Sequence, residues 1–569
     1  MFRGRLATAN ALPQLVLLAL ITGIVTALVI TAFRFLIEYG GTYLTGVENA
    51  EDFESLSVYY RVALCLGGAV LLGILLQRYN PSARRVGVVH VMERLTRHQG
   101  YLPLRNAVIQ FFGGAIALIS GQSGGREGPA IHLGATAASL LGQKFQLPNN
   151  SIRTMIACGT AAAIASSFNT PIAGVIFAME VVMMEYTVAS FLPIIVAAVT
   201  STLISQAFFG SAPAFDVSPV DMKSAFEIPY LVLAGLLIGT LAAGYTQLIQ
   251  MFTRFNAVPY WLRIVIAGAL TAGCAVVVPE VMGVGYDTVN AIMVTEVGVV
   301  LLIALLFAKA VTSAASVGLG MPVGLIGPTM VLGACVGGLF AQGLYLWQGE
   351  DVSTGLYIML GMCAMMAAVL QAPLAALMAV MEMTANANII LPAMVVIVVA
   401  TLVASQVFGQ RSVYIATLNT LGLQYPPSPV TMHLQRIGAT AIMDRSFIRL
   451  PTVISRERAN EVVAAQTRWI LVDRSDDDTV RAALNTADLA AFLDERGAEE
   501  EEIHLLELPG QRIDVTFADS QATALQVQKA LSDSQAEACC IQRTTAPLIK
   551  PIVGIVTQSH IENYRNHVE

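Results

Sequence analysis

Residues 121–129, with the sequence GQSGGREGP, decide how this chain folds. The segment joins two apolar stretches and carries Arg126 and Glu127 in a region that is otherwise almost free of charge. Its glycines let backbone amides approach a ligand closely, and Pro129 suits the first turn of a helix. The segment therefore predicts a helix that begins inside apolar surroundings. The unpaired N–H groups and the positive dipole end of such a helix bind anions without a full positive charge.

The same pattern recurs in the second half of the chain. The segment 125–129 (GREGP) has a counterpart at 324–328 (GLIGP), 199 residues further on. A second set recurs at a constant offset of 202, in which Gly159, Pro171 and Glu180 correspond to Gly361, Pro373 and Glu382. Transporters with internal repeats often hold them inverted around a site at the bilayer midplane. We therefore expect two repeated halves, about 10–210 and 225–425, whose two helix starts meet at one anion site.

The composition places most of the chain in lipid. Of the 569 residues, 55% are hydrophobic and 12% are charged, whereas soluble domains carry about 25% charged residues. Long apolar stretches (60–77, 188–209 and 389–407) are long enough to span a bilayer, while shorter ones (107–120, 129–143, 151–167, 171–184, 326–346 and 355–370) are cut by Gly or Pro. The predicted fold class of residues 1–425 is an all-α polytopic membrane domain with re-entrant helices that line a buried cavity.

The net charge argues against a nucleic-acid partner, and the spacing of cysteines and histidines argues against a metal site. The net charge of −7 and the lack of a long basic run argue against nucleic acid. The seven cysteines and seven histidines show no metal-ligand spacing, so we expect no metal site.

Residues 430–569 are much more polar and predict a separate soluble α/β domain. Short β-like runs at 469–472 and 552–556 alternate with helix-like runs. The pattern is duplicated, because the run ending at Val472 leads to 484–489 as the run ending at Ile541 leads to 556–561.

The segment 124–135 (GGREGPAIHLGA) resembles the glycine-arginine-glutamate-glycine-proline motif of the CLC family of chloride channels and chloride/proton antiporters. The repeat at 324–328 lies where that family has its second anion-binding motif, and Tyr414 lies where it has its pore tyrosine. The resemblance covers about residues 10–425, and the tail is similar to a paired CBS domain. It implies a multi-pass protein of the cell membrane that carries chloride, forms a homodimer with one pore per subunit and keeps its tail in the cytoplasm.

The resemblance also assigns roles to residues. Glu127 is implied to be the gate, with the anion held by Gly125, Arg126, Gly128, Ile326, Gly327 and Tyr414. A carboxylate at an anion site mimics the anion, and ionisable groups inside a membrane are functional candidates by default. The alternatives are that Glu127 forms a structural ion pair with Arg126 or another cation, and that Tyr414 is an interfacial tyrosine.

Two departures from the family pattern bear on mechanism. Val86 replaces the family's anion-coordinating serine, and Val181 replaces the glutamate that relays protons in the exchangers. Because an aliphatic side chain carries no proton, and the same glutamate-valine pair is typical of the family's channel members, we predict a passive chloride channel. A chloride/proton antiporter with another relay and a fluoride exporter remain as alternatives. Glu180, retained as Glu382 in the half without a gate, is expected to be structural.

In the tail, the resemblance places a nucleotide ribose at Asp488, in the first CBS copy. The matching position in the second copy is His560, close to Thr557, which we also assign to a nucleotide site. Adenine nucleotide is thus an optional ligand, and no cofactor is required. The alternative is a dimerisation domain without a ligand.

We reject the hypothesis that the chain is an intramembrane serine protease. Residues 121–124 (GQSG) match the glycine-x-serine-glycine motif of rhomboid intramembrane proteases, whose serine needs a histidine base from another membrane helix. The chain has no histidine between His132 and His433. We therefore predict that the chain is not an enzyme.

Overall fold

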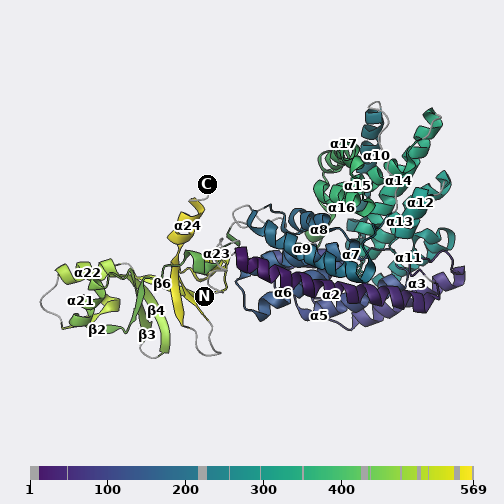
Figure 1. The fold of residues 1–569 in the computed structure, drawn as a ribbon. Coiled ribbons are helices and arrows are strands. Elements are labelled where there is room, and N and C mark those ends of the chain that lie inside the picture. The colour runs from purple at the N-terminus through teal and green to yellow at the C-terminus, as the bar shows by residue number, and fades with distance from the viewer. Residues whose placement is uncertain are drawn as a thin grey trace. The chain divides into compact units, whose positions relative to one another are not determined.

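The computed structural model describes residues 12–47, 49–186, 188–215, 227–255, 257–294, 297–348, 352–423, 434–435, 437–474, 477–495, 501–510, 512–543 and 551–566. The chain divides into two compact units (Figure 1). One comprises residues 15–144 and 152–426, and the other consists mainly of residues 427–569. The domain boundary expected between 425 and 430 lies outside the described residues.

The regular elements of the first unit that the structure describes are all helices. Its first half contains α2 (Leu12–Thr45), α3 (Val58–Gln77), α4 (Gly87–Arg97), α5 (Leu104–Ile119), α6 (Glu127–Lys144), α7 (Asn149–Phe168), α8 (Pro171–Phe177), the π-helical η1 (Ala178–Met183) and α9 (Val188–Phe209). Its second half contains α10 (Ile228–Thr253), α11 (Tyr260–Val277), η3 (Pro279–Val281), α12 (Tyr286–Val294), α13 (Val299–Gly318), α14 (Ile326–Gln348), α15 (Thr354–Leu370), α16 (Pro373–Thr384), η4 (Ala387–Ile389), α17 (Ile390–Leu402), η5 (Val403–Val407) and α18 (Val413–Thr420).

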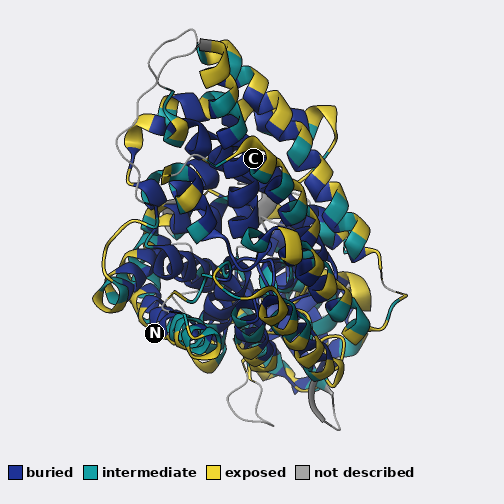
Figure 2. Cartoon of the chain, turned by 90° about the vertical axis from the view of Figure 1, so that its right-hand side faces the viewer, coloured by how far each residue is buried: buried dark blue, intermediate teal, exposed yellow. Residues whose placement is uncertain are grey.

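The helical unit has the surface of a membrane protein. Eight helical segments among the described residues are long and apolar enough to cross a bilayer. Buried residues fill the interior and exposed residues lie on the outer helices (Figure 2). Many of the exposed side chains are large and apolar, for example Leu28, Phe307 and Leu391. In water such a surface would aggregate, so we assign it to lipid.

The internal repeat is confirmed by the way the helices pack. α6 crosses α7 where Gly134 and Gly159 face each other, and α14 crosses α15 at the corresponding Gly333 and Gly361. At both crossings, a Cβ on either glycine would overlap the carbonyl oxygen of its partner. Glycine is required here because the two backbones touch, as is common between membrane helices. Glycine does not interrupt the helices at the positions expected, because α5, α6, α7, α14 and α15 run unbroken through their segments. The segment 326–346 is also wrongly expected to be short, since α14 is long and apolar enough to cross a bilayer.

The two halves also cap each other's helices. The Glu382 carboxylate accepts hydrogen bonds from the N–H groups of Ile172 (3.0 Å) and Ala173 (2.8 Å), in the first turn of α8. In the other half, Glu180 accepts from Leu374 (3.3 Å) and Ala375 (2.7 Å), in the first turn of α16. A negative charge at a helix N-terminus satisfies unpaired N–H groups and complements the dipole. The expectation that Glu180 is structural agrees with this reciprocal arrangement.

Substituting Gln for Glu382 is expected to destabilise the helical unit by about 1.5–3 kcal/mol, because a charged acceptor is lost and one backbone N–H stays buried without a partner. Glu180→Gln should destabilise the helical unit by a similar free energy. Thermal unfolding in detergent would measure both, with Glu457→Gln on the exposed face of the tail helix α21 as the matched control. Unfolding temperatures equal to that of the control would contradict the capping role.

The tail is an α/β domain, as expected. It contains α20 (Ala439–Ile442), β1 (Phe447–Leu450), β2 (Val453–Ser455), α21 (Arg456–Ala464), β3 (Trp469–Arg474), β4 (Asp477–Asn485), α22 (Thr486–Glu495), β5 (Glu502–His504), η6 (Leu505–Glu507), β6 (Ile513–Asp519), α23 (Ala524–Ser534), β7 (Ala538–Gln542), β8 (Ile552–Thr557) and α24 (Gln558–Asn566). Six of the strands form one sheet in the order β1-β3-β4-β6-β7-β8, and β2 pairs with β5.

The tail topology is duplicated. β1 pairs parallel to β3 and β3 antiparallel to β4, while β6 pairs parallel to β7 and β7 antiparallel to β8. In each copy a helix precedes the middle strand and another follows the last strand, namely α21 and α22, then α23 and α24. The repeated run seen in the sequence therefore corresponds to a repeated fold.

Candidate functional site

The two copies of the glycine-proline motif meet in the interior. Gly125 N–H donates to the Gly324 carbonyl (2.7 Å) and Gly324 N–H donates to the Gly125 carbonyl (2.6 Å), which forms an isolated antiparallel bridge. α6 begins two residues after Gly125, and α14 begins two residues after Gly324. The antiparallel meeting of the loops is what an inverted repeat predicts. It brings two helix N-termini, with their unpaired N–H groups, to one place.

Glycine at position 128 makes this approach possible. A Cβ there would lie 2.9 Å from the Gly324 Cα and 3.0 Å from the Val323 carbonyl oxygen, both of which are backbone atoms. The second loop would have to move away to accommodate any side chain. Gly128 is therefore required by the contact between the two helix starts.

Glu127 places its carboxylate at this junction and is 1% exposed. Its Oε1 accepts hydrogen bonds from Gly327 N–H (2.8 Å) and from the Tyr286 hydroxyl (3.0 Å). A Cβ on Gly125 would overlap Oε2, so this oxygen lies against the loop. Among the described residues, Oε2 has no hydrogen-bond partner. The side chain of the first α6 residue thus places a negative charge against the first turn of α14.

Arg126 does not pair with Glu127 in a salt bridge among the described residues. Its guanidinium lies over the rings of Phe168 (5.1 Å) and Tyr286 (5.5 Å). The residue lines a cavity of about 450 Å³ together with Arg34, Glu38 and Glu51, which we call the Arg126 cavity. The alternative of a structural pair between the two neighbours is therefore not the arrangement seen here. Ile326 begins α14 and lies beside Glu127 at a smaller void.

A larger cavity of about 660 Å³ reaches the same junction from another direction, and we call it the Tyr414 cavity. Its lining brings together residues that the sequence analysis singled out in separate segments, namely Val86, Gly128 and Tyr414, together with Gly324. Tyr414 is 4% exposed, on α18. The cavity therefore connects the family's pore tyrosine position to the two helix starts.

Val86 stands at the N-cap of α4 and makes no side-chain hydrogen bond to the helix. A serine in this place would cap the first-turn N–H groups. With valine, the same N–H groups have no side-chain acceptor from residue 86. The loss of the family's serine thus leaves backbone donors beside the Tyr414 cavity.

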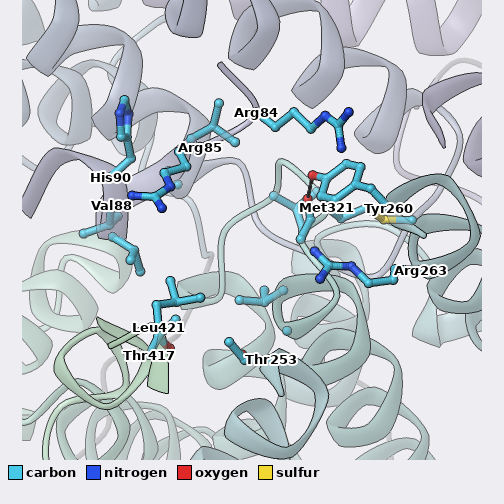
Figure 3. Close-up of a pocket in the computed structure, with 18 of the residues that line it drawn as sticks. Arg84, Arg85, Val88, His90, Thr253, Tyr260, Arg263, Met321, Thr417 and Leu421 are labelled. Carbon is cyan, nitrogen blue, oxygen red and sulfur yellow. Dashed lines mark hydrogen bonds between the residues drawn. The ribbon is translucent and has the colours of Figure 1, made fainter. Parts of the chain in front are cut away.

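Cations gather around the Tyr414 cavity. Arg84 and Arg263 lie on the two sides of the Tyr260 ring, each 5.0 Å from its centre (Figure 3). Arg85 also lines the cavity and forms an ion pair with Glu93. Three arginines against one glutamate leave the wall positive, which raises the local concentration of anions.

Val181 is buried in the π-helical segment η1 and is 4% exposed. Its neighbour Glu180 is engaged in capping α16 through both carboxylate oxygens. The position that holds a proton relay in the family's exchangers therefore carries an aliphatic group, and the adjacent carboxylate already has partners.

The structure does not bring Asp488 and Thr557 together. Asp488 lies in the first turn of α22 after β4, whereas Thr557 ends β8, and β6 and β7 lie between those strands in the sheet. Thr557 is already engaged, since its N–H donates to His560 Nδ1 (3.1 Å) and its hydroxyl lies 2.9 Å from the same nitrogen. Burial lowers the pKa of His560, with Arg468 adding to the effect, which keeps the ring neutral and able to accept these bonds.

Sequence reasoning missed two residues at the junction. Tyr286 donates to Glu127 and follows Gly283 and Gly285, which both have positive φ angles (59° and 90°). Lys309 is fully buried, and its ammonium donates to the carbonyls of Val281 (3.0 Å) and Gly283 (3.0 Å). A signal existed for each, because closely spaced glycines mark a strained turn and a lone lysine within an apolar helix is a functional candidate.

The fold and the site define a membrane protein of two repeated halves, in which two helix N-termini meet at a buried carboxylate. A family model described as "Voltage gated chloride channel" matches residues 68–405. The putative chloride channel protein ClcB-like of Ralstonia nicotianae is 30% identical over 422 residues, which cover 72% of this chain and 98% of that protein. This chain therefore belongs to the CLC family, as the sequence motifs predicted.

Two other comparisons agree with this assignment. The H(+)/Cl(-) exchange transporter ClcA of Vibrio cholerae serotype O1 is 26% identical, over 70% of this chain and 87% of that protein. Among solved structures, a slow cyanobacterial Cl-/H+ antiporter shares the fold with a TM-score of 0.62 at 22% identity, covering 73% of this chain and 98% of that one.

Proposed function

We propose that this chain conducts chloride passively across the membrane and that Glu127 is its gate. The observation that carries this proposal is the position of the Glu127 carboxylate, which accepts the N–H of Gly327 at the start of α14. Chloride seeks the same kind of donor and therefore competes with the carboxylate for the junction. When Glu127 is protonated or displaced, its place becomes available to an anion.

The two cavities supply the rest of the path. Chloride collects in the Tyr414 cavity, where Arg84, Arg85 and Arg263 make the wall positive. It then passes Tyr414 and the backbone at Gly128 and Gly327 to reach the place that Glu127 now fills. The Arg126 cavity forms the other approach. Backbone amides and one hydroxyl can replace part of an anion's hydration shell without binding it too tightly to leave.

Val181 supports conduction without proton coupling, because the family's exchangers relay protons through a glutamate at that position. Proton-coupled exchange is the second candidate, supported by the similarity to the Vibrio cholerae H(+)/Cl(-) exchange transporter. A fluoride exporter is the third, since Val86 removes the hydroxyl next to the path. Catalysis is not part of the proposal, and the buried Ser123 hydroxyl has no histidine partner among the described residues.

The proposal includes an assembly and a location. We infer a homodimer with one pathway per subunit in the cell membrane, with residues 430–569 in the cytoplasm as a CBS pair. The duplicated strand order of the tail supports the CBS assignment. A nucleotide, if one binds, would use Asp488 in the first copy, because His560 engages Thr557 in the second.

Purified protein in liposomes with a chloride gradient would test the transport mode, with chloride and pH recorded together. We expect chloride efflux without proton movement. Proton movement against its own gradient, driven by chloride, would overturn the channel proposal and establish exchange. Efflux of fluoride but not chloride would establish the fluoride exporter instead. Empty liposomes and liposomes treated with a proton ionophore provide the controls for leak and for coupling.

A further inference from the structure

Tyr286 makes the one side-chain hydrogen bond to Glu127 that the described residues contain. Its hydroxyl donates to Oε1 at 3.0 Å, and the same oxygen accepts the N–H of Gly327 at 2.8 Å. Both donors come from the second half of the chain, whereas Glu127 belongs to the first. One carboxylate oxygen is thus held by two donors, of which only the phenol can be removed without altering the backbone.

The Tyr286 ring is fixed in place on several sides. Phe168 and Phe215 each meet it edge-on, with ring centres 6.1 Å and 5.6 Å away and interplanar angles of 86°. The Arg126 guanidinium lies 5.5 Å from the ring centre. Aromatic neighbours in this geometry favour one ring orientation. The phenol is therefore aimed at the carboxylate in advance and loses little entropy in holding it.

The backbone that carries Tyr286 is fixed as well. The Lys309 ammonium donates to the carbonyls of Val281 and Gly283, two residues of the turn that leads into α12. Gly283 also hydrogen-bonds to the first loop, donating to Gly121 (3.2 Å) and accepting from Gly124 (3.4 Å). The turn before α12 and the loop before α6 consequently form one connected unit.

Resting on the proposed gate, we propose that Tyr286 is the latch of that gate, a positioning residue that holds the ionised Glu127 carboxylate at the junction. A hydroxyl that donates to a carboxylate stabilises its charged form more than its protonated form. The latch therefore sets how acidic the solution, or how concentrated the chloride, must be before Glu127 leaves. Removing the phenol hydroxyl weakens the closed state while leaving the pathway intact.

Other charged and titratable groups act on the carboxylate, on the phenol or on one another, and stay unchanged when Tyr286 is replaced. Arg126 in the loop before α6 and Tyr414 on α18 interact with the carboxylate, and Glu51 in the loop after α2 interacts with the Tyr286 hydroxyl. Lys309 on α13 interacts in turn with Glu51 and with Asp287 on α12. Because none of them is altered, a change in the pH dependence of flux after Tyr286→Phe reports on the lost hydroxyl.

The test is chloride efflux from liposomes containing Tyr286→Phe, measured over about pH 4 to 8. We expect flux at neutral pH to rise about tenfold, and the pH of half-maximal flux to move about one unit upward, as the loss of one hydrogen bond to a charged group predicts. Tyr230→Phe is the matched control, because its hydroxyl donates to the Phe340 carbonyl on α14 instead. The control should keep the original profile.

A double substitution separates this inference from the proposed function. In a Glu127→Gln background there is no charged gate to hold, so adding Tyr286→Phe should change nothing. Wild-type behaviour of Tyr286→Phe alone would overturn the latch, as would lower flux with an unmoved pH profile, which indicates a structural role only. If Glu127→Gln itself left the flux and its pH dependence unaltered, the assignment of Glu127 as the gate would be wrong. The latch proposal, which rests on that assignment, would then be wrong as well.

Discussion

Glu127→Gln is expected to leave chloride flux permanently high and almost independent of pH. The wild-type carboxylate occupies the junction as a bound anion, held by Gly327 N–H and the Tyr286 hydroxyl. The neutral amide forms weaker hydrogen bonds to the same donors, by about 1.5–3 kcal/mol when charge is lost, so chloride displaces it about 10–100 times more readily. Glutamine does not titrate in this range, so lowering the pH should no longer increase the chloride flux.

Chloride efflux from liposomes at several pH values would measure this effect. Glu457→Gln in α21 is a suitable control, because it removes an exposed carboxylate that lies outside the helical unit. A Glu127→Gln protein that is folded but passes no chloride would show that the carboxylate is needed for transport itself. In that case the assignment of Glu127 as a gate would be wrong.

Gly361→Ala is expected to destabilise the helical unit by about 3 kcal/mol or more. A Cβ at this position would overlap the Gly333 carbonyl oxygen and lie 3.0 Å from Gly337 N, so α14 and α15 would have to separate. Backbone atoms on both sides cannot rotate away as a flexible side chain could. Small residues at such crossings are what hold membrane helices together.

Thermal unfolding in detergent would measure the loss, and Gly273→Ala would provide the matched control. Gly273 lies within α11, and a Cβ there would meet nothing within 4 Å. Alanine favours helix over glycine by about 1 kcal/mol, so the control should be neutral or slightly stabilised. Equal unfolding temperatures for the two variants would show that the helix crossing adapts to a methyl group.

Features that depend on short stretches of sequence were predictable. The helix starts at Glu127 and Ile326 follow from glycine and proline next to apolar runs. The repeat follows from motifs at nearly constant offset, and the strands β3 and β8 follow from short β-branched runs. Each of these signals acts through the local backbone, which the sequence reports directly.

The contacts that complete the junction were not predictable in the same way. Tyr286 meets Glu127 across a separation of 159 residues, and no repeat or spacing links the two. Lys309 reaches carbonyls 26–28 residues earlier, on a turn whose path depends on its glycines. In the tail, Thr557 is engaged by a histidine three residues away, a contact that depends on how α24 begins. The contacts of Tyr286 and Lys309 arise only when distant segments have packed together, whereas the Thr557 contact needs only the local turn into α24.

The bridge between Gly125 and Gly324 has a consequence for how the protein is made. Each of these residues satisfies the backbone groups of the other, yet they leave the ribosome 199 residues apart. At about 5–20 residues per second, the first loop waits about 10–40 s for its partner. During that interval, unpaired backbone groups and the charge of Glu127 are costly in hydrocarbon. The first half must therefore stay beside water, the translocation machinery or a chaperone until the second half arrives.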